Sequence, residues 1–113
     1  MSDLKLNPKV SVIMPVYNAD KFLSQSIESI LNQSFTDFEF LIYNDGSSDD
    51  SDQIIRSYSD DRIHYFNFEE NKGLVHILNE GLTDSKGVYI ARMDADDISM
   101  PNRFLEQVAF MEN

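Results

Sequence analysis

The sequence predicts an α/β fold with a mainly parallel sheet covered by helices. Short apolar segments rich in β-branched residues alternate along the chain with segments whose apolar residues recur at helical spacing. The strand segments are nearly continuous in apolar residues, which is typical of parallel strands buried on both faces. Acid-rich turns follow two of these segments, and the carboxyl end of the strands is the edge at which open α/β sheets bind ligands.

The predicted strands cover residues 10–14, 38–43, 63–67 and 88–93. The predicted helices cover residues 20–32, 52–58 and 74–82, and a last helix begins at residue 101. Asn18 or Asp20 is expected to cap the first helix, because both side chains can accept a hydrogen bond from a backbone N–H group. The residues expected to face the core are Leu23, Ile27, Ile30, Leu31, Ile54, Ile55, Tyr58, Leu74, Ile77, Leu78, Leu82, Phe104, Leu105, Val108 and Met111.

Length and composition indicate one globular domain, residues 1–113. The chain is 42% hydrophobic and 26% charged. It has no cysteine, which excludes a disulfide framework and a thiolate zinc site. The net charge of −11 argues against nucleic acid as the partner, because such a chain repels phosphate backbones. For the same reason, a diphosphate ligand would need a positive group between itself and the protein.

Three carboxylates, those of Asp94, Asp96 and Asp97, come directly after the last predicted strand. Carboxylates placed so closely repel one another, and such clusters commonly persist because a cation binds them. Oxygen ligands suit Mg²⁺ or Mn²⁺, which can bridge carboxylates to phosphate oxygens. The sequence therefore predicts a metal and diphosphate site here. The alternative is an exposed acidic loop that caps the helix beginning at Pro101.

The turn after the second predicted strand contains Asp45 and Gly46. An acid at this position can accept hydrogen bonds from the ribose or base of a nucleotide. A helix cap in a solvated turn is the alternative. Residues 15–20, after the first strand, contain no glycine, so a glycine-rich phosphate loop is excluded there.

Weaker candidates are Tyr17, which can stack on a base or pack in the core, and the segment 71–73, which can contact a nucleotide or form a plain loop. Arg92 lies within the last predicted strand. Its charge needs a partner, which the adjacent acids or a phosphate can supply.

Five segments resemble the family 2 glycosyltransferases, which have the GT-A fold, in order and in approximate spacing. They are residues 10–18 (VSVIMPVYN), 44–49 (NDGSSD), 71–73 (NKG), 79–81 (NEG) and 87–97 (GVYIARMDADD). Together they cover nearly the whole chain. Where many members have two acids before the Gly-Ser, the first position here is Asn44. Where relatives often have Ala-Arg, this chain has Ile77-Leu78.

The resemblance implies inverting transfer of a sugar from a nucleotide diphosphate, usually a UDP-sugar, to a hydroxyl of a saccharide or lipid-linked acceptor. It implies that Asp94 and Asp96 form the DxD pair, with Asp96 the direct ligand of Mn²⁺ or Mg²⁺, and that Asp97 faces the donor sugar or the acceptor. The remaining donor-binding residues that it implies are Pro15, Tyr17, Asp45, Asn71 and Gly73, and Arg92 is a further candidate.

The family's acceptor-binding segment and general base lie beyond the position of Asn113. We therefore expect a GT-A domain truncated after the DxD region, inactive alone and able to self-associate through an uncovered apolar face. Two other functions stay open, a non-catalytic nucleotide-binding fragment and a sugar nucleotidyltransferase. Residues 1–9 show no secretory signal, so we expect a cytoplasmic location, which for the full-length protein includes the inner face of the membrane.

Overall fold

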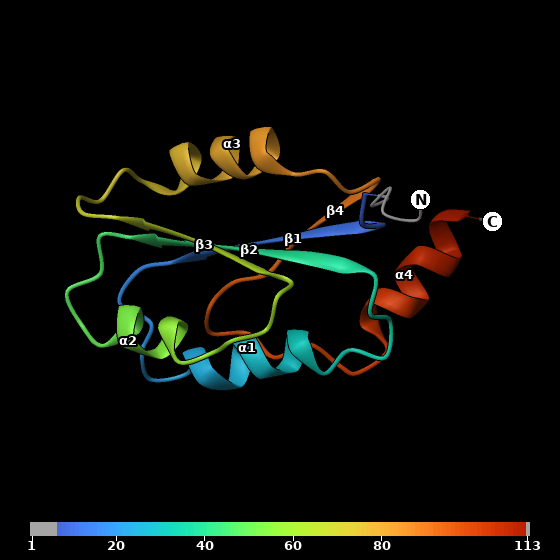
Figure 1. Ribbon diagram of the computed structural model, residues 1–113, viewed down its shortest axis with the longest axis horizontal. Coiled ribbons are helices and arrows are strands. Elements are labelled where there is room, and N and C mark those ends of the chain that lie inside the picture. The colour runs from blue at the N-terminus through green and yellow to red at the C-terminus, as the bar shows by residue number, and fades with distance from the viewer. Residues whose placement is uncertain (1–6, 113) are drawn as a thin grey trace.

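The computed structural model describes residues 7–112 and contains a four-stranded, wholly parallel sheet. Its strands are β1 (Val10–Val16), β2 (Phe38–Asp45), β3 (Ile63–Phe68) and β4 (Tyr89–Arg92), in the order β3-β2-β1-β4 (Figure 1). β1 therefore lies between β2 and β4. The predicted α/β class with a parallel sheet is confirmed.

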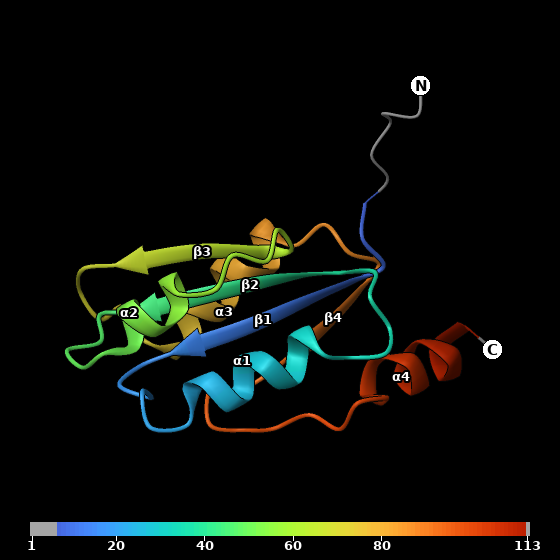
Figure 2. The same cartoon turned by 60° about the horizontal axis from the view of Figure 1, so that its bottom comes forward.

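Helices cover both faces of the sheet. They are α1 (Leu23–Leu31), α2 (Ser51–Arg56), α3 (Leu74–Asp84) and α4 (Arg103–Glu112). In Figures 1 and 2, α3 covers one face, α1 and α2 cover the other, and α4 lies beyond the end of α1. None of the helices among residues 7–112 is long and apolar enough to cross a bilayer.

Alternation along β1 divides its side chains between two cores. Val10, Val12, Met14 and Val16 pack with α1, with Ile55 of α2 and with Phe104 and Val108 of α4. On the opposite face, Ile13, Leu41 and Tyr43 pack with Ile77 of α3. Both faces of the central strands are therefore buried, as their nearly continuous apolar sequence predicts.

The first helix begins later than predicted. It starts at Leu23, and the residue before it, Phe22, provides no side-chain cap. Asn18 and Asp20 instead accept hydrogen bonds from the backbone of the turn that follows β2, at Ser48 and Asp50. The predicted cap is wrong because these side chains join two turns and do not bind their own helix.

Several residues predicted to face the core are exposed: Leu74, Leu82, Leu105 and Met111. Along α3 and α4 the buried apolar side chains are Ile77, Phe104 and Val108, so each helix buries a narrower stripe than its sequence suggests. β4 likewise is not a strand buried on both faces. It lies at the edge of the sheet, and Ile90 is 46% exposed.

Candidate functional site

The turn after β1 and the turn after β2 interlock through reciprocal hydrogen bonds. The amide of Asn18 donates to Ser47 Oγ at 2.9 Å, and Asn18 Oδ1 accepts the amide of Ser48 at 2.8 Å. The amide of Asp20 likewise donates to Asp49 Oδ2 at 3.1 Å. Because each turn supplies both donors and acceptors, the two form one frame at the carboxyl end of the sheet.

A cavity of about 290 Å³ lies beside this frame. Its lining consists of Pro15, Val16, Tyr17, Asp45, Asn71, Gly73, Leu74 and Asp94. Six of the predicted donor-binding residues therefore meet at one place, although they come from four separate segments of the chain. Tyr17 is 55% exposed, so the alternative that it packs in the core is wrong.

Asp45 is the most enclosed acid of this cavity, with only 4% of its surface exposed. Its Oδ1 accepts the amide of Lys72 at 2.6 Å and its Oδ2 accepts the amide of Gly73 at 3.0 Å. The side chain of Asn71 donates to the Asp45 carbonyl at 3.1 Å. Asp45 therefore holds the loop before α3, a role that the sequence did not reveal. Each carboxylate oxygen keeps a second lone pair for another donor.

Gly46 brings the same two segments into close contact. Its φ is +75°, and a Cβ at this position would lie 2.5 Å from the Asn71 nitrogen. A side chain here would need both a left-handed backbone and space that the loop already occupies. Glycine after Asp45 is therefore required by packing as well as by the turn.

Asn44, which stands where many family members have an acid, is buried beside Asp45. Its Nδ2 donates to Asn67 Oδ1 at 3.1 Å and to Tyr65 Oη at 3.2 Å, whereas its Oδ1 is buried without a partner among the described residues. Tyr65 Oη donates to Asp52 Oδ1 at 2.6 Å. Burial, together with this contact to a carboxylate, raises the pKa of Tyr65 to about 12.

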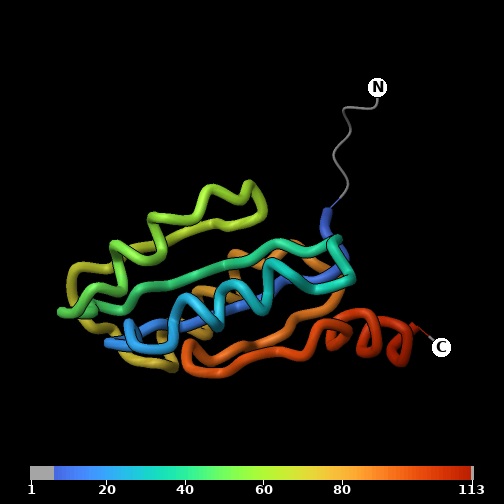
Figure 3. The backbone as a smooth tube through the Cα atoms, turned by 90° about the horizontal axis from the view of Figure 1, so that it is seen from below, coloured from blue at the N-terminus to red at the C-terminus, as the bar shows by residue number. Residues whose placement is uncertain are grey.

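The segment that follows β4, residues 93–99, carries the three acids and is called the acidic turn below. It is docked on α1. Ser26 Oγ donates to the Ala95 carbonyl at 2.7 Å, and Ser29 Oγ accepts the amide of Ser99 at 3.0 Å. Gln33, which is buried, donates to the Met100 carbonyl at 2.6 Å. Figure 3 shows this segment, in orange and red, running beside α1.

The sequence interpretation missed these three polar residues of the α1 region. The available signal was a stripe of serine and glutamine, at Ser26, Ser29 and Gln33, beside apolar residues that face the core. Polar side chains on a buried face need partners, and here the partners are backbone groups of the acidic turn.

The three carboxylates of the turn do not converge. Within residues 7–112 there is no group of three or more acidic, histidine or cysteine side chains placed to hold a metal ion. Asp94 Oδ1 lies 3.1 Å from both Nε and Nη2 of Arg92, and Asp96 and Asp97 are exposed. The metal site that the sequence predicts at these acids is therefore not preformed by three converging side chains among the described residues, and it stays a prediction. The prediction that an adjacent acid partners Arg92 agrees with this geometry.

The donor set still fits Mg²⁺ or Mn²⁺. Asp94 and Asp96 supply exposed or partly exposed carboxylate oxygens, and Mg²⁺ is commonly held by one or two carboxylates together with substrate phosphates and water. A complete cage of protein ligands is not required for such a site. Asp94 also lines the cavity that Asp45 lines, whereas Asp96 does not.

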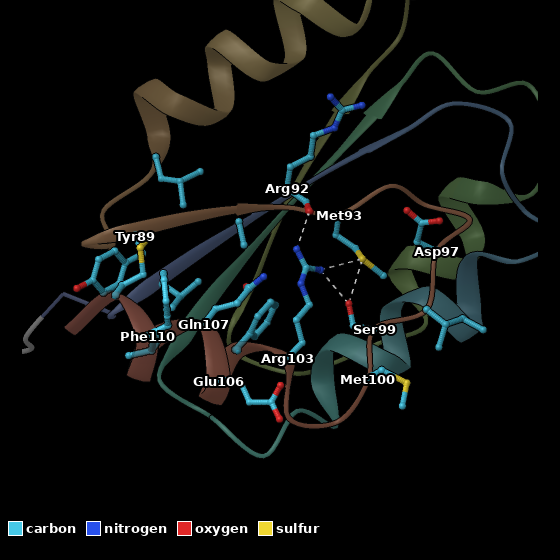
Figure 4. A pocket seen from close by; sticks show the side chains of 17 residues that line it. Tyr89, Arg92, Met93, Asp97, Ser99, Met100, Arg103, Glu106, Gln107 and Phe110 are labelled. Carbon is cyan, nitrogen blue, oxygen red and sulfur yellow. Dashed lines mark hydrogen bonds between the residues drawn. The ribbon is translucent and has the colours of Figure 1, made fainter. Parts of the chain in front are cut away.

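A larger, open groove of about 900 Å³ lies between β4 and α4 (Figure 4). Much of its lining is apolar and uncovered; Met100 is 75% and Phe110 is 84% exposed. Arg92 and Asp97 line this groove and not the smaller cavity. The structure therefore separates these two predicted residues from the six that meet around Asp45.

Comparison with protein families gives a match to the model described as Glycosyl transferase family 2, over residues 11–113. The putative glycosyltransferase EpsE of Bacillus subtilis is 45% identical over 108 residues, which are 93% of this chain and 39% of that protein. An uncharacterized glycosyltransferase of Methanocaldococcus jannaschii is 42% identical over 110 residues, which are 94% of this chain and 38% of that protein. The chain thus spans about two fifths of these relatives.

Solved structures show the same fold. The crystal structure of S. aureus TarS in complex with UDP-GlcNAc superposes with a TM-score of 0.86 and 28% identity, over 92% of this chain and 31% of that one. The mannosyltransferase PcManGT from Pyrobaculum calidifontis, in complex with GDP-Man and Mn²⁺, gives a TM-score of 0.79 at 22% identity. That match covers 93% of this chain and 32% of the mannosyltransferase, and at this identity it speaks for the fold alone.

Proposed function

Because the chain belongs to glycosyl transferase family 2, we propose that it is the donor-binding part of an inverting enzyme that uses a nucleotide diphosphate sugar. The proposed donor is a UDP-sugar, and the proposed acceptor is a hydroxyl of a saccharide or lipid-linked molecule. The observation that carries this proposal is that Pro15, Tyr17, Asp45, Asn71, Gly73 and Asp94 line one cavity.

The proposed nucleoside site is the end of the cavity near Tyr17 and Asp45. The exposed ring of Tyr17 can stack on a base, and the free lone pairs of the Asp45 carboxylate can accept N–H or O–H groups of base and ribose. The relative TarS was crystallised with UDP and with UDP-GlcNAc, which supports a uridine nucleotide.

The proposed diphosphate site is the end of the cavity near Asp94. A divalent cation held there by Asp94 and Asp96 would offset the charge that develops on the departing diphosphate. This answers the problem that the net charge of −11 poses for an anionic ligand.

In the proposed reaction, the acceptor hydroxyl oxygen attacks the anomeric carbon of the sugar from the face opposite the diphosphate. The new C–O bond forms as the bond to the diphosphate oxygen breaks, and the acceptor proton passes to a carboxylate general base. We propose that this base lies outside residues 1–113. Asp97, in the acidic turn, would then face the sugar or the acceptor.

Titration calorimetry with UDP tests the proposal, with and without Mn²⁺. We expect UDP to bind more tightly when Mn²⁺ is present, and this increase to disappear in Asp96→Ala. Asp61→Ala is the matched control, because Asp61 is an exposed acid far along the chain from the turn. Equal metal-dependent binding by wild type and Asp96→Ala would remove Asp96 from the metal site.

The same titrations distinguish the other functions. Metal-independent UDP binding that Asp96→Ala leaves intact would favour a non-catalytic nucleotide-binding module. Preference for a nucleoside triphosphate over UDP would favour a sugar nucleotidyltransferase. Sugar transfer by the 113-residue chain alone would refute the proposal that the base lies elsewhere.

We also propose that the 113-residue chain self-associates through the groove between β4 and α4. Exposed apolar side chains gather there, and an edge strand offers unpaired backbone groups. Sedimentation equilibrium over a range of protein concentrations tests this. A monomer at all concentrations would refute it.

A further inference from the structure

Arg103, at the start of α4, extends its side chain across the groove to the acidic turn (Figure 4). Its Nη1 donates to Ser99 Oγ at 2.9 Å, and its Nη2 donates to the Arg92 carbonyl at 3.2 Å. Met93 Sδ lies 3.5 Å from the same Nη1. Neither the pattern of the sequence nor the family resemblance drew attention to this residue.

The two oxygen acceptors of Arg103 stand at opposite ends of the acidic turn. Arg92 is the last residue of β4, and Ser99 follows the acids that the turn carries. The guanidinium group is planar and rigid, so its two N–H groups set the distance between these ends. The turn is therefore held both by Arg103, which lines the groove, and by Ser26 and Ser29 of α1.

Arg103 forms no direct ion pair with a carboxylate of the described residues. Among the described residues, none of the ion pairs within 4.0 Å includes it, whereas Arg92 pairs with Asp94. A cation held close to the turn by neutral acceptors lowers the repulsion among the three acids without occupying their oxygens. Arg103 therefore leaves those oxygens to a metal ion, although Asp94 Oδ1 already contacts Arg92.

We propose that Arg103 is a positioning residue, which holds the acidic turn in the shape that lets Asp94 and Asp96 bind a divalent cation together. This inference rests on the proposed function. Arg103 itself is not proposed to contact the nucleotide sugar. It acts on the carboxylates of Asp94 and Asp96 by holding the two ends of the acidic turn.

The test compares UDP binding, with and without Mn²⁺, in the wild-type chain and in Arg103→Gln. We expect the metal-dependent gain in UDP affinity to fall roughly tenfold, as for other residues that orient metal ligands. UDP affinity without metal should stay within about twofold, because the cavity around Tyr17 and Asp45 does not include Arg103. Arg56→Gln, which removes the same charge from an exposed position, should leave both affinities unchanged.

Two further variants separate positioning from a general effect on folding. Arg103→Lys keeps the positive charge but loses the planar guanidinium group that reaches both acceptors. We therefore expect it to recover only a small part of the affinity that Arg103→Gln loses. Ser99→Ala removes one acceptor without changing any charge, and we expect a smaller loss of the metal-dependent gain with an unchanged affinity for UDP alone. It also serves as the test if Arg103→Gln does not fold.

The outcomes separate the inference from the proposed function. A wild-type chain without metal-dependent UDP binding would refute the proposed function. Metal-dependent binding that is the same in wild type, Arg103→Gln and Ser99→Ala would refute the inference alone. A parallel loss of UDP affinity with and without metal would also overturn it, because that pattern indicates general damage to the fold.

Discussion

The hydroxyl group of Ser26, in the middle of α1, donates a hydrogen bond of 2.7 Å to the carbonyl oxygen of Ala95 in the acidic turn. Both residues are buried, so the bond is shielded from water. It fixes the backbone between Asp94 and Asp96, the two residues proposed to bind the metal. A helix whose sequence suggests only packing thus also determines where the acids lie.

Replacing Ser26 with alanine should weaken the fold and the acidic turn together. The Ala95 carbonyl would be left buried without a donor, which costs about 1–3 kcal/mol. Urea denaturation should show a loss in the free energy of unfolding of this size, and Mn²⁺-dependent UDP binding should weaken. Ser24→Ala, at an exposed position of the same helix, is the control. A Ser26→Ala chain as stable as this control would contradict the role of the bond.

Asp45→Asn should release the loop before α3. Asparagine offers one oxygen where the carboxylate now accepts the amides of both Lys72 and Gly73. We expect a loss of stability of about 1–3 kcal/mol and faster hydrogen exchange at these two amides. Asp61→Asn, an exposed acid, should change neither quantity. Unchanged exchange at Lys72 and Gly73 would show that the carboxylate does not hold this loop.

Gly46→Ala and Gly73→Ala form a matched pair. Both glycines have positive φ, +75° and +95°, so alanine costs roughly 1–3 kcal/mol of backbone strain at either position. At Gly73 the added Cβ meets no atom within 4 Å, whereas at Gly46 it would lie 2.5 Å from the Asn71 nitrogen. Chemical denaturation should therefore show the larger loss for Gly46→Ala. Equal losses would mean that the contact with Asn71 relaxes freely.

Tyr65 should contribute to the loss of stability of the chain at high pH. Burial and the contact with Asp52 raise its pKa from 10.0 to about 12, so the folded state holds the phenolic proton more tightly than the unfolded state. This contribution is complete below pH 10 and is lost as the pH rises toward 12. Thermal unfolding measured across this range should decline less steeply for Tyr65→Phe than for wild type. Parallel declines would contradict the assignment.

The number, order and type of the elements could be predicted because they depend on local patterns. Nearly continuous apolar runs indicated the parallel strands, and helical spacing around Ile27 and Ile77 indicated two of the helices. The placement of Tyr17, Asp45 and Asp94 at one edge followed from the rule that parallel strands end on the same side.

The remaining features depend on contacts between distant residues. The sequence does not state that β4 lies at an edge, so the exposure of Ile90 could not be foreseen. The cap predicted at Asp20 failed because a partner from a different turn, Asp50, competes for its carboxylate. The position of Arg103 depends in the same way on how α4 turns back toward β4, which no local pattern determines.

The position of β1 between two partners has a consequence for the order in which the chain folds. Val10 pairs with Phe38 on one side and with Tyr89 on the other, so the second pairing closes a much longer loop of chain. Longer loops cost more entropy to close, and we expect β1 and β2 to pair before β4 joins them. Pulsed hydrogen exchange would then show the amides of β4 protected last. The part of the cavity near Tyr17 and Asp45 would thus assemble early, and the acids of the turn after β4 would reach it only as folding is completed.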